Sequence, residues 1–390
     1  MLLFSAAARA DPPHAGPHTE PNVAPFLGGD SDIGFGGGAF GAITRTDESL
    51  KPKYVWRLEA GFLATFKPPS SGAPLRLPYQ DYYALLSVPH LFDDRVRLEV
   101  RPSYTRETTQ HYYGIGNASR DTAPEAPDDA NDPYWEYGRT HPTLVVRARV
   151  RLHRELFLLL GNSYTRDSLD VRPNSKLAKD GVAGPLTHAV DFFEYGLEVD
   201  QRDDDIVTKR GTWDQIKLRL SPGGTNDMPY RYGQLDAIAR QYVPIGARVV
   251  VAMRGVFDMQ FGDPPFYELA RFEDTFALGG SMGVRGVPGQ RYYGKVKAFG
   301  NLETRVHLFD FHLFGAPLAL GTAVFFDGGR VWTEIGHAHP DLDGTALGLK
   351  YGIGGGLRLI QGTTFVIRGD LAWSPDAHPI GGYFAAGEVF

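Results

Sequence analysis

The sequence predicts an all-β protein, specifically a transmembrane antiparallel β-barrel of sixteen strands with a long loop at about 262–295. Alternation of period two dominates the 390 residues, and helical periodicity is nearly absent. Many alternating segments exceed ten residues, and their polar faces mix charges of both signs. No segment approaches about 18 consecutive apolar residues, which excludes a transmembrane helix. A chain of this kind can span a membrane only as a closed barrel, because lipid satisfies no backbone polar group.

The alternation places apolar and charged side chains on opposite faces of the same segment. In residues 248–261, Val251 and Phe257 share one face, while Arg254 and Asp258 share the other. A soluble β-sandwich also alternates, but its polar face meets bulk water. Long strands with charges of both signs on one face favour a lipid-facing exterior and a wet, salt-bridged interior. Residues 95–104 and 363–373 repeat the pattern.

Turn and loop signals divide the chain into strands in the following order. Fifteen are expected near 31–43, 54–66, 78–90, 94–107, 133–152, 155–171, 190–202, 211–221, 231–243, 247–261, 296–309, 316–327, 346–360, 363–373 and 380–390. A sixteenth, Asn22–Gly29, follows from parity, because fifteen strands would put the N-terminus of a secreted chain outside the cell. Tight connections such as 153–154 alternate with long ones at 108–132, 172–189, 262–295 and 328–345. Short periplasmic turns and long outer loops are typical of outer-membrane barrels.

The ends and the composition set further expectations. Leu2–Ala8 is a short apolar run before a small-x-small site at Ala8–Ala10, so residues 1–10 are interpreted as the remnant of a signal peptide. A frayed tail is the alternative. Residues 11–21 would form a short periplasmic tail and residues 22–390 the barrel. The net charge of −6 argues against a nucleic-acid partner, and the absence of cysteine excludes disulfides and thiolate sites.

Several segments could suggest chemistry, but their context does not support it. Gly34–Gly38 and Gly352–Gly356 are rich in glycine, but no helix pattern follows, so strand bending or close packing is favoured over a phosphate cradle. His337–Asp343 contains metal-ligand residue types, although a solvated loop is the stronger interpretation. There is no nucleophile elbow and no zincin helix. We expect no enzyme activity, no metal site and no cofactor.

Five motifs occur in order along residues 110–390. They are Tyr112–Asn117, Asp200-Gln-Arg-Asp203 with Arg210-Gly211, Phe276–Gly286 with its Val-Arg-Gly core, Gly300–Arg305, and Phe325–Trp332. Together they resemble the BamA/TamA superfamily of outer-membrane assembly and translocation barrels, which includes the bacterial surface antigen family. Val287 stands where the family has an aromatic residue, which is a mild departure.

The resemblance implies that the loop at about 262–295 folds inward and forms an internal lock, in which Arg285 lies between Glu303 and Asp327. Pleat parity independently puts both carboxylates on the inner faces of their strands. A guanidinium suits this place, since it stays charged and offers a planar fork of donors. Gly283 and Gly286 flank the arginine and would allow a tight, buried backbone. The alternative is an ordinary outer loop with a solvated arginine.

The resemblance also assigns two further motifs. Asp200, Arg202, Asp203 and Gly211 would form a strand-and-turn motif. The last strand, Gly381–Phe390, would carry the barrel-assembly signal, with Phe390 as its final aromatic residue. Phe384, Glu388 and Phe390 share one parity, which would place Glu388 on the lipid side, tolerable at the periplasmic rim.

The resemblance also implies a function. It implies insertion or translocation of proteins at the bacterial outer membrane, through a seam between the first and last strands that opens to a client strand. Relatives carry periplasmic POTRA domains, and about a dozen residues before the first strand leave no room for one. A passive or gated channel for solutes or lipids is one alternative. A surface antigen, or an anchor for a separate periplasmic or POTRA-bearing partner, is the other. The expected partners are outer-membrane lipid, client proteins and such a separate partner.

Overall fold

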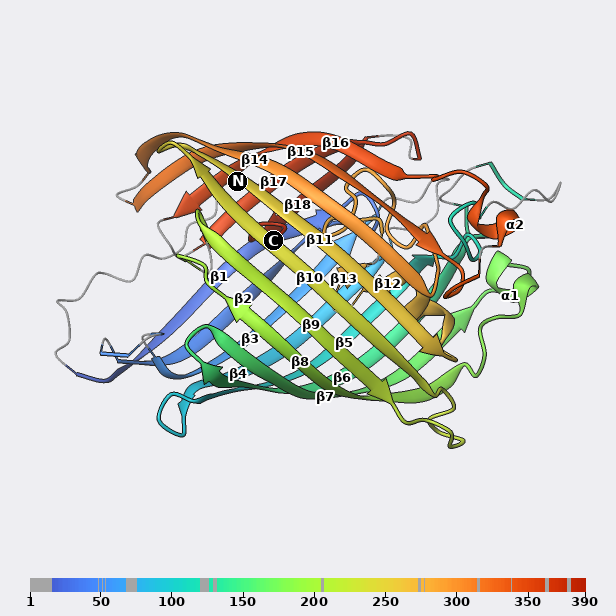
Figure 1. The fold of residues 1–390 in the computed structure, drawn as a ribbon, viewed down its shortest axis with the longest axis horizontal. Helices are drawn as coiled ribbons and strands as arrows, with labels where there is room; N and C mark the ends of the chain where they lie inside the picture. The colour runs from blue at the N-terminus through green and yellow to red at the C-terminus, as the bar shows by residue number, and fades with distance from the viewer. Residues whose placement is uncertain are drawn as a thin grey trace.

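The fold is a closed antiparallel β-barrel (Figure 1). The computed structural model describes residues 16–390 except 48, 51, 53, 68–75, 120–125, 129–131, 205–206, 273–274, 277, 314–315, 338, 362–364 and 377–379. In this part of the chain, sixteen strands form the wall, and each pairs with its neighbours in sequence order until β18 meets β1. Strands β12 and β13 pair only with each other, inside the loop between β11 and β14. The predicted fold class and strand number are confirmed.

The wall strands are long enough to cross a membrane at a tilt. Their bounds are β1 His18–Asp30, β2 Gly34–Thr46, β3 Tyr54–Phe66, β4 Tyr79–Leu91, β5 Val96–His111, β6 Glu136–His153, β7 Leu156–Val171, β8 Thr187–Asp200, β9 Gly211–Ser221, β10 Tyr232–Ile245, β11 Val249–Gly262, β14 Val296–Leu313, β15 Ala316–Trp332, β16 Lys350–Gln361, β17 Phe365–Trp373 and β18 Gly381–Ala386. The remaining elements are α1 Lys176–Asp180, η1 Phe266–Ala270, β12 Arg271–Phe272, β13 Thr275–Phe276 and α2 Pro340–Asp343. Among the described residues, no helix is long and apolar enough to cross a membrane.

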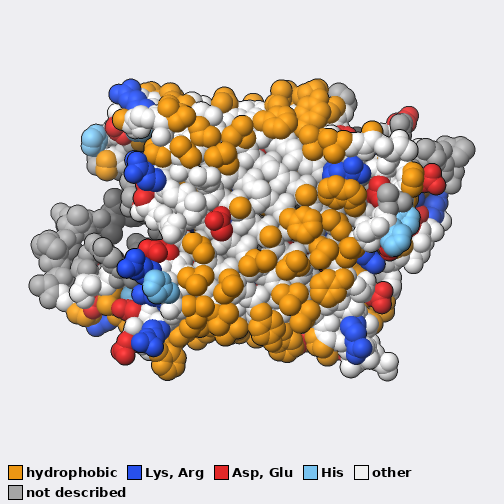
Figure 2. Space-filling model, in the orientation of Figure 1, with side chains coloured by type: hydrophobic (Ala, Val, Ile, Leu, Met, Phe, Trp, Pro, Cys, Tyr) orange, Lys and Arg blue, Asp and Glu red, His pale blue; other side chains and the backbone are white. Residues whose placement is uncertain are grey.

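Period-two alternation builds an apolar outer surface and a charged interior. Apolar side chains cover much of the wall in Figure 2, and charged side chains gather toward its two ends. Inside, Arg139 and Asp167 form an ion pair of 2.7 Å across β6 and β7, and Lys297 pairs with Asp258 across β14 and β11. Each of these four side chains is almost fully buried. The lumen is therefore a packed polar core, because buried charges are stable only when they are paired.

The two ends of the barrel differ. One end, the loop end, has the long connections 112–135, 172–186, 263–295 and 333–349, and it carries both short helices (Figure 1). The other end, the turn end, has tight turns such as 92–95 and 154–155. This asymmetry matches the alternation of short turns and long loops predicted from the sequence.

The predicted strands all overlap strands of the structure, with differences at their ends. The largest is at the end of β15, predicted at 327 and found at Trp332. The first strand begins at His18 rather than Asn22, so residues 18–21 belong to the barrel and not to a tail. The last strand ends at Ala386, so its predicted continuation to residue 390 is wrong. The predicted signal-peptide remnant lies outside the described residues.

Candidate functional site: the lumenal loop and the strand seam

The loop between β11 and β14, residues 263–295, folds into the lumen. Its middle section is buried, with Val284, Arg285, Val287 and Tyr293 fully inaccessible to solvent. These side chains lie against the inner faces of the wall strands, because alternation there supplies apolar residues among the charged ones. The apolar core formed in this way consists of Ile238, Val256, Phe272, Leu278, Val284, Val287, Tyr292, Phe299 and Val331.

Arg285 lies between the two carboxylates that the sequence assigns to it. Its Nε and Nη2 atoms donate to the two carboxylate oxygens of Asp327 at 2.8 and 3.1 Å, and its backbone N–H donates to Asp327 at 3.1 Å. Its Nη1 atom lies 3.1 Å from the Glu303 carboxylate. The guanidinium also stacks on Phe325, 3.3 Å from the ring centroid. Bidentate geometry of this kind gives strong, directional hydrogen bonds.

The surroundings keep Arg285 charged. Burial alone would lower its pKa, but Asp327, Glu303 and a third carboxylate, Asp370, together raise the pKa above the usual arginine range. Asp370 lies on β17, with an oxygen 3.2 Å from Nη1 of Arg285. A buried charge with several paired acceptors is stable, whereas loss of any one partner leaves an uncompensated ion.

Sequence reasoning missed the part of this network contributed by β16 and β17. Arg358 bridges Glu303 at 3.0 Å and Asp370 at 2.5 Å. Arg368 adds a further contact to Asp370 at 2.8 Å. We call the set Arg285, Glu303, Asp327, Arg358, Arg368 and Asp370 the Arg285 network. The only signal in the sequence was alternation, which put Arg368 and Asp370 on the polar face of their segment without indicating how deeply they lie.

Glycines allow the loop to approach the wall. Gly286 has φ +93°, and its backbone N–H donates to the Tyr383 hydroxyl on β18 at 2.7 Å. A Cβ on Gly283 would lie 2.6 Å from the carbonyl oxygen of Leu278. On the wall, a Cβ on Gly352 would lie 1.8 Å from the carbonyl oxygen of Arg285. Gly352 belongs to the glycine-rich segment for which the sequence favours strand bending or close packing.

The outer loops contact one another and the lumenal loop at the loop end of the barrel. The Tyr112–Asn117 motif contributes a bridge between Ile115 and Tyr293, and the Asn117 amide donates to the Gly348 carbonyl at 2.8 Å. Tyr293 also belongs to a buried aromatic and aliphatic cluster: Tyr112, Tyr137, Leu169, Leu177, Phe266, Tyr267, Leu269, Ala270 and Tyr293. Four connections that are distant in sequence thus form one cap.

Strands β1 and β18 close the barrel through a short seam. They pair at two positions, Gly29 with Phe384 and Asp30 with Tyr383. A further backbone hydrogen bond of 3.0 Å runs from Ser31 to Gly382. On its other side, β1 pairs with β2 along its entire length. Within the described residues, therefore, the edge of β1 from His18 to Gly28 has no strand partner on the β18 side.

The lumenal loop also contacts the turn between β1 and β2, at the loop end of the seam. The backbone N–H of Gly289 donates to the Asp32 carboxylate at 2.8 Å. Burial, assisted by the neighbouring Asp30, raises the pKa of Asp32 to about 7, although the Gly289 hydrogen bond and Lys67 oppose the shift. The proton occupancy of Asp32 therefore changes near neutral pH at a contact between the loop and the seam.

Beyond β18 the chain leaves the wall. Gly387 has φ +84°, and residues 387–390 turn into the lumen. Glu388 forms an ion pair of 2.9 Å with Arg358, and the carbonyl oxygen of Phe390 accepts from Arg305 at 2.9 Å. The predicted lipid-side position of Glu388 is wrong, as is the placement of Phe390 on the last strand. The positive φ at Gly387 ends the strand, and the buried arginines attract the segment inward.

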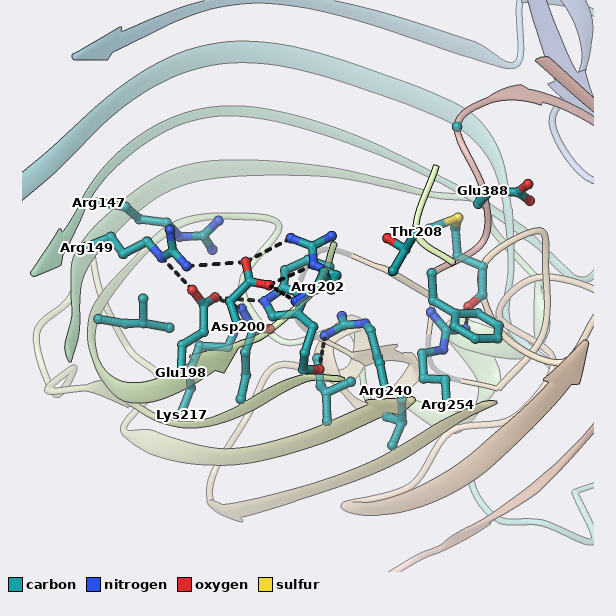
Figure 3. Close-up of a pocket in the computed structure, with 18 of the residues that line it drawn as sticks. Arg147, Arg149, Glu198, Asp200, Arg202, Thr208, Lys217, Arg240, Arg254 and Glu388 are labelled. Atoms are coloured by element: carbon teal, nitrogen blue, oxygen red, sulfur yellow. Dashed lines mark hydrogen bonds and ion pairs between the residues drawn. The ribbon is translucent and has the colours of Figure 1, made fainter. Parts of the chain in front are cut away.

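The predicted strand-and-turn motif forms a compact structure at the turn end. Arg202 forms hydrogen bonds to Asp200 at 2.9 and 3.0 Å, and Asp203 accepts the backbone N–H groups of Lys209 and Arg210. Gly211 has φ +115°, and a Cβ there would lie 2.1 Å from the carbonyl oxygen of Gln201. Asp200 and Arg202 also line the lumen cavity shown in Figure 3.

The outer loop containing His337–Asp343 has a structural role. The Asp343 carboxylate accepts from the backbone and the hydroxyl of Thr333 and from the backbone of His339. In the described ranges, no three His, Asp or Glu residues come together in an arrangement that could hold a metal ion.

A closed sixteen-stranded barrel with an apolar outer face and a charged lumen defines an outer-membrane β-barrel protein. Residues 79–388 match the Omp85 superfamily domain. The chain belongs to the Omp85 superfamily, a group of non-enzymatic barrels, and its location is the bacterial outer membrane. No curated protein sequence matches it.

Three solved structures have a similar fold. BamA from Haemophilus ducreyi lacking POTRA domains 1–3 matches with a TM-score of 0.60 and 14% identity, over 95% of this chain and 70% of that chain. CdiB from Escherichia coli matches with a TM-score of 0.54 and 14% identity, over 93% and 62%. CdiB from Acinetobacter baumannii matches with a TM-score of 0.51 and 12% identity, over 94% and 59%. This chain thus spans less than two thirds of either CdiB structure, and at these identities the likeness establishes the fold.

Proposed function

We propose that this protein assists the insertion of proteins into the outer membrane through the seam between β1 and β18. The observation that carries the proposal is the short pairing of these strands, at two positions only. An unpaired strand edge presents a row of backbone donors and acceptors, which is a template for another strand. The β1 edge from His18 to Gly28 has this character, and it lies toward the turn end, which by convention faces the periplasm.

Opening the seam should cost little compared with opening any other part of the wall. Few backbone hydrogen bonds cross it, and glycine lowers strand stability on its β1 side, at Gly28 and Gly29 in β1 and at Gly36–Gly38 in β2. A client strand would add to β1 by backbone hydrogen bonding, in the manner of β-augmentation. The Arg285 network would act as a lock, holding the lumenal loop in place while the wall opens beside it.

A disulfide across the seam tests this proposal, because the native chain has no cysteine. Ser31 and Gly382 lie opposite each other at the loop end of the seam. A Cβ on Gly382 would make only van der Waals contacts, so a cysteine fits there. In proteoliposomes, oxidised Ser31→Cys/Gly382→Cys should lose the ability to accelerate folding of a urea-unfolded eight-stranded barrel, and reductant should restore it. The matched control is oxidised Leu371→Cys/Gly382→Cys, which joins two residues that are paired between β17 and β18. This disulfide does not cross the seam, so the variant should stay active. Undiminished acceleration by the oxidised seam variant would contradict lateral opening.

A channel and a membrane anchor are the alternatives. A channel requires withdrawal of the lumenal loop and of the cap formed by the outer loops. Steady, large conductance of the wild-type protein in a planar bilayer would favour it. An anchor for a separate periplasmic or POTRA-bearing protein is compatible with seam opening, and co-purification of such a partner would support it.

A further inference from the structure

The segment after β18, Gly387–Phe390, contacts the wall of the lumen as a bound peptide would. Its acidic side chain, Glu388, pairs with Arg358 at 2.9 Å. The carbonyl oxygen of Val389 accepts a hydrogen bond from Arg254 at 3.2 Å, and that of Phe390 accepts one from Arg305 at 2.9 Å. Charged donors thus bind both the backbone and the side chain of this segment.

The aromatic ring of the segment has its own set of contacts. Phe390 lies with its ring centroid 5.0 Å from the guanidinium carbon of Arg254 and 5.3 Å from that of Arg305. The Tyr242 ring is 6.4 Å away. Cation–π contacts of this type are selective for an aromatic side chain. Val389, between the two anchoring residues, is buried.

Arg254 supports the view that this wall is built to bind a chain segment. It is 7% exposed, and within the described residues no carboxylate lies at ion-pair distance from it. Instead its guanidinium donates to three neutral oxygens: Asn301 Oδ1 on the wall, the Met282 carbonyl of the lumenal loop and the Val389 carbonyl. A buried guanidinium without a carboxylate is costly, so acceptors from an inserted segment stabilise it.

The surface around Phe390 continues into a cavity of about 670 Å³ (Figure 3). Its lining has eight arginine or lysine side chains and five carboxylates, one of which is Glu388 itself. In one wall, Arg202 and Arg240 stack on Trp213, with guanidinium carbons 4.0 and 3.9 Å from the ring centroid. The cavity therefore has room and an excess of positive charge for a longer acidic and aromatic segment than the one it holds.

We propose that this cationic part of the lumen is a binding site for an extended peptide segment that carries an acidic residue and, two positions later, an aromatic residue. Gly387–Phe390 occupies part of the site within the same chain. The proposal deepens the proposed function and rests on it only for the source of such a segment, a client or partner protein. A competing segment would displace residues 387–390 and leave β18 freer at the seam.

The test measures binding of a fluorescent peptide to the full-length protein in detergent micelles. The probe is Gly-Glu-Val-Phe, blocked at both ends so that no terminal charge contributes. Binding should be saturable. It should be about tenfold tighter to the variant Glu388→Gln/Phe390→Ala, whose own segment competes less, because charge-assisted contacts are each worth about a factor of ten.

Further variants make the site specific. In the Glu388→Gln/Phe390→Ala background, Arg254→Gln should weaken binding about tenfold. Arg248→Gln is the matched control, because Arg248 is exposed at the turn end, and it should have no effect. Retained heat-modifiable migration on gels establishes that each variant is folded. Should Arg254→Gln fail to fold, the peptide Gly-Gln-Val-Ala provides the same comparison and should bind at least tenfold more weakly.

Three results would overturn the proposal. The first is no saturable binding of Gly-Glu-Val-Phe to Glu388→Gln/Phe390→Ala, and the second is equal binding of Gly-Glu-Val-Phe and Gly-Gln-Val-Ala. The third is that phosphatidylglycerol displaces both peptides equally, whatever the charge of the peptide. The last result would assign the site to anionic lipid. These outcomes are separable from the seam experiment, since seam locking can abolish client folding whether or not the peptide binds.

Discussion

At the residue scale, Arg285 holds the lumenal loop to the wall of the barrel. Three carboxylates, from β14, β15 and β17, surround one guanidinium that belongs to a loop. The loop therefore cannot leave without separating buried ion pairs. The cost of that separation depends on every partner remaining in place, because a single deletion leaves charge without compensation.

Arg285→Ala should lower the free energy of unfolding by about 3–5 kcal/mol, the usual cost of breaking a buried ion pair. Arg285→Lys should recover only part of this, since an ammonium cannot form the two parallel bonds to Asp327. The midpoint of the heat-induced gel shift measures the effect. Arg248→Ala, at an exposed arginine, is the control and should change stability by less than about 0.5 kcal/mol. Equal midpoints for Arg285→Ala and Arg248→Ala would rule out the lock.

Asp32 should make stability depend on pH in a defined direction. Its folded pKa of about 7 exceeds the ordinary value of 3.8, so the folded state holds the proton more tightly than the unfolded state does. The stabilisation of the folded state by this proton is fully present below about pH 4, and it is lost as the pH rises toward 7. Asp32→Asn keeps an acceptor for Gly289 but cannot ionise. The unfolding midpoint of Asp32→Asn should therefore exceed that of the wild type increasingly from pH 4 to pH 8; a constant difference would contradict the assignment.

Sequence reasoning located some residues of the Arg285 network and not others, for a physical reason. Motifs located Arg285, Glu303 and Asp327, and parity placed the two carboxylates on the inner faces of strands adjacent in sequence. Arg358 and Asp370 reach the same point from β16 and β17, and their contacts depend on strand register and side-chain length. Alternation gives the face of a residue but not its height along the barrel or its partner on another strand.

At the element scale, close packing between the lumenal loop and β16 depends on glycine. Gly352→Ala would place a Cβ 1.8 Å from the Arg285 carbonyl oxygen, so the backbone of the loop must shift. We expect faster proteolysis of residues 263–295 and a lower unfolding midpoint. Gly255→Ala, on the outer face of β11 with open space around it, is the matched control and should behave as wild type. A normal proteolysis rate for Gly352→Ala would mean that the loop is not held against this strand.

Strand positions were predictable to within a few residues, since membrane-crossing strands alternate over long distances. The end of the last strand could not be predicted. Its alternation continues through Glu388 and Phe390, so the sequence pattern alone extends β18 by four residues beyond Ala386. The inward turn at Gly387 requires a positive φ and a cationic lumen to receive the segment. Both conditions are properties of the folded barrel.

At the scale of the whole molecule, the barrel combines a rigid side with a weak one. The wall from β2 to β17 is continuously paired, the cap joins four loops, and the Arg285 network joins the lumenal loop to β14, β15 and β17. Weakness is confined to the seam, where β18 is short and the edge of β1 is open. Closure of a sixteen-stranded sheet could be predicted from parity, but the length of pairing at the seam could not, because it depends on where the last strand ends.

Capture of a client at the β1 edge tests the central claim most directly. A photo-crosslinking residue at Val23, on β1 and 71% exposed, should trap a folding eight-stranded barrel in proteoliposomes, because the client strand pairs there. The same crosslinker at Leu197, on β8 and 45% exposed, should give only background. Equal crosslinking at both positions, or none at Val23 while folding is accelerated, would contradict insertion through the seam.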